Sequence, residues 1–475
     1  MAALSDGTVR WYRMRDGREV FAYFQHNNDR DWIAWLPSGY YVSSVYGDNH
    51  IGWHLNRSID QAPDFHRAVQ FDRVLYRPDL VAGGFAEAVG KTARAGPDVV
   101  AGDEFNAARL QEIAPPRLRI LEATVKPDSG RDVLVLRLRG EQGAAPTMDV
   151  SVFVNRIPML RATERKLGRR EAERFERTFE IPLSQRQNDI RVEAFNGFSL
   201  GVAETYLGLP EDLKIKPARG DLYVLAIGVN EFPQLPARLN LAYAARDAEE
   251  FVKAIERQGS GYFRKIHTQI VSDFTSDKPT REQIAEALEF IHRAEPTDIV
   301  MVFLASHGIS DPAGNYYFVP RDARLDDLKR LETGGKIESL MPWTEFFDSL
   351  RMVAGKRLLI VDTCQARNIE GRFESHSLMK RSAASQFSLM LASKGDEESQ
   401  EYPEAKHGLF TYSLITSIAD GSDRNRDGYL SVSEWFSAST PIVERGRDKR
   451  VGPQTPQLVA PEPLGDTALI PLKGR

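Results

Sequence analysis

From residue 221 onward, short apolar runs alternate with longer stretches in which apolar residues recur at helical spacing. The apolar runs predict buried strands at 221–229, 263–271, 299–305, 357–361 and 387–392. The stretches between them predict helices at 247–257, 280–294, 343–353 and 408–419. Near-continuous apolar strands separated by helices are typical of a mostly parallel sheet covered on both faces. We therefore predict an α/β domain over residues 220–475.

A different pattern occupies residues 115–210. Apolar and polar residues alternate with a period of two in several short segments, and turn residues such as Gly140 and Asn188 separate them. Short strands at this spacing predict an all-β sandwich of antiparallel sheets. The segment resembles immunoglobulin-like modules, although the Cys…Trp…Cys pattern of antibody domains is missing.

The first 60 residues contain a short repeat. The segment 6–11 (DGTVRW) recurs at 48–53 (DNHIGW), a shift of 42 residues, which matches the period of WD40 blades. Residues 1–60 therefore resemble a WD40-like fragment, and about one and a half blades cannot close a propeller. Two interpretations stay open, a small sheet packed on its neighbour and a remnant of a larger propeller. Residues 61–114, broken by Pro and Gly, are predicted to form a connector.

Composition excludes several classes of protein. Hydrophobic residues make up 42% of the 475 residues and charged residues 27%, which is a globular balance. The net charge of −5 does not favour a nucleic-acid partner. No signal peptide and no apolar run long enough to span a membrane are evident, so we expect a cytoplasmic protein with no membrane partner.

The chain has one cysteine, Cys364, which excludes intrachain disulfides. Cys364 follows the predicted strand 357–361, and His307 follows the predicted strand 299–305, 57 residues earlier. The carboxyl ends of parallel strands meet at one edge of a sheet, so these side chains are expected to lie close together. A neighbouring imidazole activates a thiol as a nucleophile. The alternative is an inert cysteine beside a structural histidine.

A carbonyl under nucleophilic attack becomes an oxyanion that needs preorganised N–H donors. Gly308 follows the histidine and has no side chain to keep a substrate away from the main chain. The N–H groups of Gly308 and Cys364 are therefore the predicted oxyanion hole.

Residues 221–457 resemble the caspase-like cysteine peptidases, the clan of caspases, metacaspases and bacterial relatives. The matching segments, in order, are YVLAIGVN (223–230), RDA (246–248), the pair His307-Gly308, DTC (362–364), HGLFTYSL (407–414) and PQTPQ (453–457). The resemblance implies a catalytic dyad of His307 and Cys364. The sequence departs from relatives at the histidine motif, which is ASHG where they commonly carry SGHG. It also has Gln365 and Ala366 after the cysteine, where metacaspases usually carry His-Ser-Gly. These departures leave the shape of the pocket open.

The resemblance also suggests a specificity. In metacaspase-like relatives an aspartate at the position of Asp362, and one at the position of Asp247, line a pocket for Arg or Lys. Two converging carboxylates favour a guanidinium or ammonium group and disfavour an acidic side chain. The alternative is that Asp247 favours a helix N-terminus and Asp362 caps a turn. Arg246 stands where the family has Asn and is expected to neutralise Asp247 in part.

The segment 365–386 after the nucleophile is predicted to be a long loop. It carries four basic residues, Arg367, Arg372, Lys380 and Arg381. A peptidase selective for basic residues can cut itself in such a loop, so these four are candidate autocleavage sites. An ordinary solvated loop is the alternative.

Residues 423–434 fit the calcium-binding loop of an EF-hand. The expected oxygen ligands are Asp423, Asn425, Asp427, the Tyr429 carbonyl and a bidentate Glu434. A single unpaired hand and two arginines in the loop speak against binding, and a turn held by its own side chains is the alternative. Ca²⁺ at this loop is the predicted cofactor, and the peptidase chemistry itself requires none.

These features predict a cysteine endopeptidase that cuts after Arg or Lys, in a bacterial regulatory, immune or cell-death pathway. Its partners would be protein or peptide substrates with basic residues, and an activating protease or regulatory protein. Two other hypotheses stay open: a catalytically silent scaffold acting through its β modules, and a caspase-like protease with acidic specificity.

Overall fold

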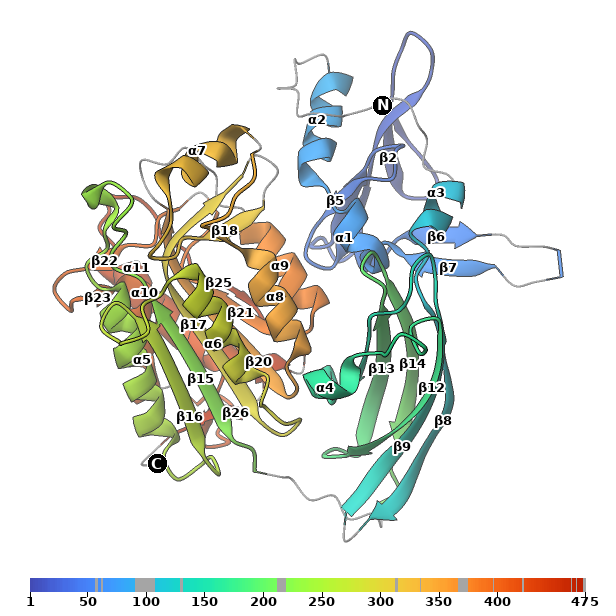
Figure 1. The fold of residues 1–475 in the computed structure, drawn as a ribbon. Coiled ribbons are helices and arrows are strands. Elements are labelled where there is room, and N and C mark those ends of the chain that lie inside the picture. Colours follow the sequence, from blue (N-terminus) through green and yellow to red (C-terminus); the bar gives the residue numbers. More distant parts are fainter. Residues whose placement is uncertain are drawn as a thin grey trace. The chain divides into compact units, whose positions relative to one another are not determined.

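The structure is a computed structural model of the 475-residue chain. It describes residues 1–55, 59–60, 63–89, 107–128, 131–211, 219–311, 315–333, 335–365, 375–395, 397–420, 423–462, 464–466 and 468–472. The chain divides into two compact units. One consists of Met1–Val152 and Lys166–Ile215, and the other of Phe153–Arg165 and Lys216–Arg475 (Figure 1).

The second unit is built on a mixed sheet with a parallel centre. Its strand order is β16-β15-β17-β20-β21-β25, and β18 and β19 extend it beside β17. The five parallel strands are β15 (Leu222–Gly228), β16 (Ile266–Ser272), β17 (Ile299–Ser310), β20 (Lys356–Gln365) and β21 (Ser388–Leu391). The antiparallel strands are β25 (Gln457–Val459), β18 (Tyr316–Phe318) and β19 (Met341–Pro342). The predicted α/β fold with a mostly parallel sheet is confirmed.

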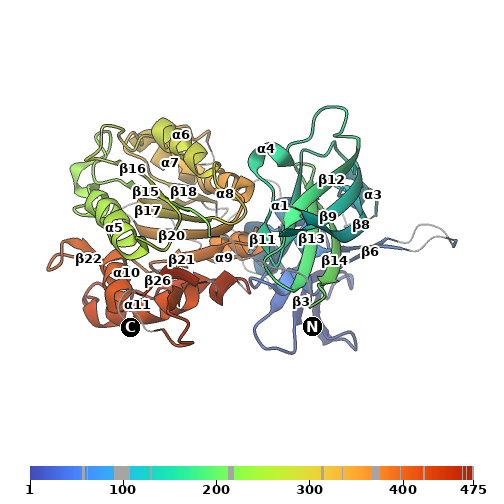
Figure 2. The ribbon, with the colours of Figure 1, turned by 90° about the horizontal axis from the view of Figure 1, so that it is seen from below.

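Helices cover both faces of this sheet (Figure 2). One face carries α5 (Ala244–Gly259), α10 (Leu409–Asp420) and α11 (Val432–Gly446). On the other side lie α6 (Arg281–Ile291), α7 (Leu325–Thr333) and α8 (Trp343–Met352). Thr280 caps α6 by accepting a hydrogen bond from the Gln283 N–H, as the capping pattern in the sequence predicts.

Alternation along the strands decides which residues meet the α5 face. Every second residue of β17, namely Met301, Phe303 and Ala305, belongs to the core shared with α5, α10 and α11, as do Leu358 and Ile360 of β20. Because side chains alternate between faces of a strand, His307 and Asp362 continue these two rows. This hydrophobic core therefore ends beside His307, a candidate catalytic residue, and Asp362, a predicted pocket acid.

Two strands run further than their apolar segments indicate. β17 continues to Ser310 and β20 to Gln365, so His307, Gly308 and Cys364 lie inside strands rather than after them. The physical reason is pairing: β20 stays in register with β17 through Gly308, and β18 adds an antiparallel partner for residues 308–310. Hydrogen bonding to neighbours extends the strands beyond the point where hydrophobicity predicts an end.

The predicted long loop over 365–386 is wrong in its second half. Residues Ser375–Ala384 form helix α9, which packs Leu378 and Ala383 into the interior. The buried apolar residues Leu378 and Ala383 are five residues apart, which does not match the i, i+3, i+4 spacing of an amphipathic helix. Residues 366–374 lie outside the described part of the chain.

Residues 117–208 form two antiparallel sheets, as the predicted all-β sandwich requires. One sheet has the order β12-β9-β8, from Arg174–Pro182, Arg131–Glu141 and Arg117–Asp128. The other has the order β11-β10-β13-β14, from Ile157–Pro158, Asp149–Val154, Gln187–Phe195 and Leu200–Gly208. A short helix, α4 (Ala162–Arg165), follows β11. The immunoglobulin-like label remains a resemblance in sequence.

The N-terminal segment is an antiparallel meander of five strands. These are β1 (Ala2–Ala3), β2 (Thr8–Tyr12), β3 (Glu19–Gln25), β4 (Trp32–Trp35) and β5 (Tyr41–Ser43), in that order. The two copies of the sequence repeat fall in different sheets, the first in β2 and the second across the 3₁₀ helix η1 (Gly47–Asn49) and strand β6 (Gly52–Leu55). Nothing in this arrangement establishes a WD40 blade.

The predicted boundary between this sheet and a connector at residue 61 is not a boundary of packing. Strand β7 (Asp64–Arg67) pairs with β6 across it. The elements after it are the 3₁₀ helix η2 (Ala68–Phe71), α1 (Asp72–Leu75), α2 (Pro78–Ala88) and α3 (Ala107–Glu112). Phe71, Leu75 and Leu110 share one hydrophobic core with Ile33 and Tyr41. Residues 64–112, where described, therefore complete the N-terminal fold, because the meander needs an apolar cover.

None of the helices in the described ranges is both long enough and apolar enough to cross a membrane.

Candidate active site

His307 and Cys364 are register partners on neighbouring parallel strands. β17 and β20 pair from Ile299↔Lys356 through His307↔Cys364 to Gly308↔Gln365. Residues directly opposite each other in a sheet belong to the same face and are neighbours across it. The described structure includes the backbone of Cys364, while its side chain and that of Gln365 lie outside it. The two residues that the sequence singles out thus meet at the same place in the sheet.

The imidazole of His307 is held in one orientation. It is buried, with 5% of its surface exposed, and its Nε2 lies 2.6 Å from the main-chain oxygen of Leu239. The ring of Phe232 packs on it at a centroid distance of 5.2 Å. A carbonyl oxygen can only accept a hydrogen bond, so Nε2 carries the proton and donates it. The neutral ring then has its basic lone pair on Nδ1.

Leu239 is the last residue of the 3₁₀ helix η3 (Ala237–Leu239), in the loop between β15 and α5. Asn230 organises this loop, because its side chain accepts from the Ala245 N–H at 2.7 Å and donates to the Ala242 carbonyl at 3.2 Å. The carbonyl that orients His307 is thereby tied to the start of α5. A main-chain acceptor has no signature in the sequence, which is why sequence reasoning missed it.

Gly308 lies in β17 where no side chain fits. A Cβ atom at this position would collide with the hydroxyl of Tyr316, which donates to Thr363 Oγ1 at 2.8 Å. The requirement for glycine here is therefore steric and comes from the strand β18 beside it. Its role in an oxyanion hole stays a prediction.

Asp362 is a buried carboxylate with three donors around it. Oδ1 accepts from the Ser399 hydroxyl at 2.6 Å, and Oδ2 accepts from the hydroxyl of Thr411 at 2.6 Å and from its N–H at 3.1 Å. Burial raises the pKa of Asp362 above its ordinary value, and these hydrogen bonds oppose the rise. The donors come from α10 and the loop before it, so Asp362 does not cap a turn of its own strand.

Asp247 lies on the first turn of α5 and faces inward. Its carboxylate accepts from His407 Nδ1 at 2.6 Å and from the Gly408 N–H at 2.8 Å, with 2% of the residue exposed. Burial raises the pKa of Asp247 to about 7, although the hydrogen bond from His407 opposes the rise. Arg246, one position earlier, is exposed. The partial neutralisation of Asp247 by Arg246 stays a prediction, and His407 is the basic group hydrogen-bonded to this carboxylate.

Gly408 brings the two acids together. A Cβ atom on Gly408 would lie 2.8 Å from Asp362 Oδ2 and 3.0 Å from Asp247 Oδ2, so both carboxylates lie close to the same glycine and leave no room for a side chain there. Gly408 and His407 form the short strand β23 (His407–Gly408), paired with β22 (Glu401–Tyr402), just before α10. The sequence motif HGLFTYSL marked this segment without assigning it a role. In the structure its first two residues, His407 and Gly408, contact the predicted pocket acids.

The EF-hand-like loop closes on itself through its own oxygens. Asp423 accepts from the N–H groups of Asp427 and Gly428, and Asn425 also accepts from Asp427. Glu434 reaches back to the N–H groups of Arg424 and Asn425 at 2.8 and 3.2 Å, and with Ser431 it forms the capping box of α11.

The strand of this loop has a partner. Residues Tyr429–Ser431 form β24, which pairs with β26 (Ala468–Pro471), where an EF-hand ordinarily pairs with a second hand. The oxygen-only donor set and the ring closed by Glu434 fit a hard cation such as Ca²⁺. The hydrogen bonds are equally those of the alternative, a turn held by its side chains. Calcium binding stays a prediction.

The candidate autocleavage residues fall in two groups. Arg367 and Arg372 lie outside the described residues. Lys380 and Arg381 lie in helix α9, and Lys380 is buried, with 1% of its surface exposed. A helix does not present its main chain as the extended strand that peptidases bind, so the structure does not favour the bonds after Lys380 and Arg381.

Comparison with solved structures gives only weak similarities. Among solved structures, the similar chains include a β-galacturonidase from Eisenbergiella tayi, at 9% identity and a TM-score of 0.16, and β-glucuronidase 3 of Bacteroides uniformis, at 10% and 0.17. The alignments cover 52% and 57% of this chain and only 47% and 32% of those chains. At these TM-scores the likeness bears on neither fold nor function. No curated protein matches the chain.

The family model of the Caspase domain matches residues 222–465. These residues run from the first strand of the parallel sheet to the 3₁₀ helix η4 (Leu464–Asp466) and contain His307, Cys364 and both predicted pocket acids. The match spans just over half of the 475 residues. The protein belongs to the caspase-domain family of cysteine-type peptidases.

Proposed function

We propose that the protein is a cysteine endopeptidase that hydrolyses peptide bonds after Arg or Lys. The observation that carries the proposal is the register of the central strands, in which His307 stands opposite Cys364 while its Nε2–H is bound to a carbonyl. This tautomer leaves Nδ1 as the proton acceptor for a neighbouring thiol. The family match supports the cysteine-type chemistry.

The proposed reaction has two halves. The Cys364 thiol gives its proton to His307 Nδ1, and the thiolate attacks the carbonyl carbon of the scissile bond. The resulting imidazolium is stabilised by the Leu239 carbonyl at Nε2, which accepts a charge-assisted hydrogen bond. His307 then returns the proton to the leaving amine, and the C–N bond breaks. Water, deprotonated by His307, hydrolyses the thioester and restores the thiol.

Gly308 and Cys364 are the proposed donors to the oxyanion. Main-chain N–H groups at the nucleophile and beside the histidine are the kind of donors that stabilise an oxyanion. The role assigned to their N–H groups rests on this placement at the end of β17 and β20.

Asp247 and Asp362 are the proposed acceptors for the basic side chain. Both carboxylates lie close to Gly408, and two carboxylates there match the several N–H donors of a guanidinium or ammonium group. His407 is hydrogen-bonded to the Asp247 carboxylate in the structure, so a substrate cation has to displace this hydrogen bond or bind the carboxylate together with His407. An acidic side chain in the same place would meet two buried carboxylates, which disfavours caspase-like specificity for Asp.

A panel of fluorogenic peptides tests the proposal. The peptides differ only in ending with Arg, Lys, Asp or a neutral residue, and they are offered to the wild type, to Cys364→Ala and to His307→Ala. His376→Ala, in α9, is the control for loss of a histidine outside the dyad. We expect cleavage after Arg and Lys by the wild type and the control, and none by the dyad variants.

Other outcomes identify the competing hypotheses. Cleavage only after Asp overturns the pocket assignment and leaves the dyad in place. No cleavage of any peptide, with correct folding shown by circular dichroism, favours a scaffold acting through the β modules or a zymogen awaiting activation. The resemblance to caspase-like proteins extends the proposal to a regulatory, immune or cell-death pathway, in which an activating protease or regulatory protein is a further partner.

A further inference from the structure

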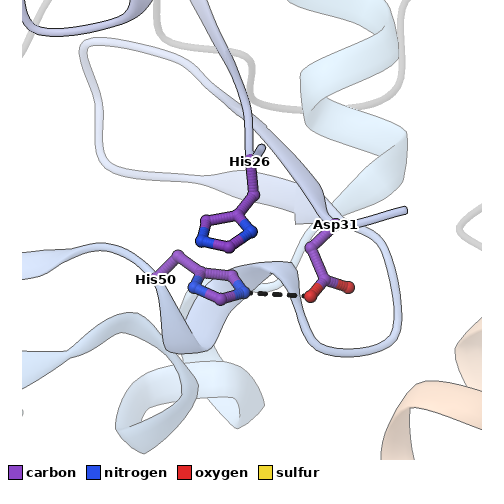
Figure 3. A group of neighbouring side chains, drawn as sticks. All are labelled: His26, Asp31 and His50. Carbon is purple, nitrogen blue, oxygen red and sulfur yellow. Dashed lines mark hydrogen bonds and ion pairs between the residues drawn. The ribbon is translucent and has the colours of Figure 1, made fainter. Parts of the chain in front are cut away.

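Three potential metal ligands gather at one end of the N-terminal meander, in the first unit of the chain. His26 and Asp31 flank the loop between β3 and β4, and His50 follows η1 (Figure 3). One ligand atom from each lies within 4.8 Å of the other two. Among the residues that the structure describes, no other group of three His, Cys, Asp or Glu side chains has its ligand atoms this close together.

The loop that holds His26 and Asp31 is closed by main-chain hydrogen bonds. The His26 N–H donates to the Asp31 carbonyl at 2.8 Å, which brings the two residues face to face across the hairpin. Asn28 fills the loop and accepts from the N–H groups of Arg30 and Asp31 at 3.1 and 2.9 Å. The spacing of two ligands is therefore set by a tight turn rather than by flexible side chains.

A close approach of two backbone segments brings in the third ligand. Gly47, the first residue of η1, packs against the main-chain oxygen of Trp32, where a Cβ atom would collide. Ser44 reinforces the contact, because its N–H donates to the Trp32 carbonyl at 2.9 Å and its hydroxyl accepts from the Trp32 N–H at 3.0 Å. Gly47 lets η1 lie directly on β4, and His50 then reaches Asp31.

The three side chains point toward one another. His50 Nε2 lies 2.9 Å from Asp31 Oδ2, and the rings of His26 and His50 stack with centroids 4.0 Å apart and an interplanar angle of 18° (Figure 3). The side chains of His50 and Asp31 are 29% and 14% exposed, so the carboxylate is largely covered and the imidazole remains open to solvent.

Outer hydrogen bonds fix the carboxylate. Asp31 Oδ1 accepts from the Ser44 hydroxyl at 3.3 Å, and Oδ2 accepts from Asn28 Nδ2 at 2.8 Å. Burial raises the pKa of Asp31, but the hydrogen bonds from His50 and Asn28 outweigh it and leave the pKa below the ordinary value. The carboxyl is therefore ionised at neutral pH. Partners of this kind orient the ligands of metal sites in proteins.

We propose that His26, Asp31 and His50 bind one Zn²⁺ ion. Two imidazole nitrogens and one carboxylate oxygen are a ligand set that zinc accepts, with a fourth tetrahedral position left for water. Calcium and magnesium prefer all-oxygen sites, so two histidines select against them. The ion would lie between His50 Nε2 and Asp31 Oδ2, the two atoms that the hydrogen bond now joins.

Zinc at this site ties the β3–β4 hairpin to the segment before β6. The bridge joins residues 26 and 31 to residue 50 and closes the intervening chain into a loop. An ion that binds the folded state and not the unfolded state raises the melting temperature in proportion to the logarithm of its concentration. The expected role is a structural lock on the N-terminal meander, independent of the peptidase chemistry.

Isothermal titration of the full chain with ZnCl₂ tests the proposal. The measurements use the Cys364→Ala background, because the dyad itself offers a thiolate and an imidazole that bind zinc. The ligand variants are His26→Phe, which keeps a stacking ring, and His50→Gln. His54→Gln is the matched control, since His54 is an exposed histidine of neighbouring β6 outside the cluster.

We expect one equivalent of zinc to bind and to raise the melting temperature in the background and in His54→Gln. Affinity should fall at least tenfold in His26→Phe and in His50→Gln, and MgCl₂ should give no response. The proposal is overturned when the background binds no zinc, or when both ligand variants bind it as tightly as the control. Circular dichroism of each variant separates lost binding from lost folding.

Discussion

Replacing Asp362 with Asn removes a buried charge from the proposed pocket without removing its volume. Asn keeps an oxygen that can accept from the N–H and hydroxyl of Thr411, and the Ser399 hydroxyl can rotate to accept from the new amide. The folded structure should therefore survive. We expect the free energy of unfolding to change by less than about 2 kcal/mol, the scale of one net hydrogen bond.

The expected effect on activity is larger and depends on the substrate. A hydrogen bond to a charged group contributes about 1.5–3 kcal/mol, which corresponds to about 10- to 150-fold in kcat/KM. The loss should appear mainly in KM, because the side-chain contact is the same in the ground state and the transition state. A peptide with a neutral residue at the cleavage site makes no such contact and should be cut nearly as fast as by the wild type.

The matched control is Asp298→Asn. Asp298 is another buried aspartate of the same unit, at the opposite end of β17, where it accepts from the N–H groups of Asp221 and Glu295 at 2.7 and 2.8 Å. Steady-state kinetics on the Arg and neutral peptides should separate the two variants. An Arg activity of Asp362→Asn within twofold of the wild type, or an equal loss on both peptides, would refute the pocket assignment.

Three further results are expected. The ratio of kcat/KM on the Arg peptide to kcat/KM on the neutral peptide should rise as pH increases through about 7. Burial raises the pKa of the Asp247 carboxyl to about 7, and this group binds a cation only after losing its proton. A ratio that does not change with pH contradicts this, and Asp247→Asn should remove the rise. Calcium should raise the melting temperature of the wild type but not of Glu434→Gln, a variant in which the capping box of α11 can still form. If a calorimetric titration of the wild type with calcium gives no heat and its melting temperature does not change, calcium binding is excluded. Intact-mass analysis after activation should show cuts at Arg367 or Arg372 in the wild type and none in Cys364→Ala. Cuts after Lys380, which is buried in α9, would contradict the structure.

Much of the peptidase fold follows from hydrophobic periodicity. Five apolar runs became the five parallel strands, and four amphipathic stretches became α5, α6, α8 and α10. The ends of β17 and β20 could not be predicted in this way, because they depend on hydrogen bonds to neighbouring strands. Helix α9 was not predicted because its buried apolar residues do not follow helical spacing. Residues 61–114 were predicted as a connector, and their packing into the N-terminal core was not predicted because its partners lie far away in the sequence.

The candidate site divides along similar lines. The family motifs marked His307, Cys364, Asp247 and Asp362, because each is a chemically distinctive side chain beside a strand or helix. The groups that set their behaviour carry no such mark: a main-chain carbonyl at Leu239 fixes the tautomer of the histidine. The contact between His407 and Asp247 spans 160 residues and follows from the packing of β23 against α5. Geometry of this kind appears only once the chain is folded.

The two predicted pocket acids, Asp362 and Asp247, are both buried. Asp362 is 6% exposed, and the groups that lower its pKa, the hydroxyls of Ser399 and Thr411 and the N–H of Thr411, are all neutral. Asp247 lies close enough for Asp362 to raise its pKa further. Burying two carboxylates beside one glycine costs desolvation free energy, which the hydrogen bond from His407 to Asp247 offsets in part. In the proposed function a substrate guanidinium would compensate both charges at once, which is the reason to expect a basic residue at the cleavage site.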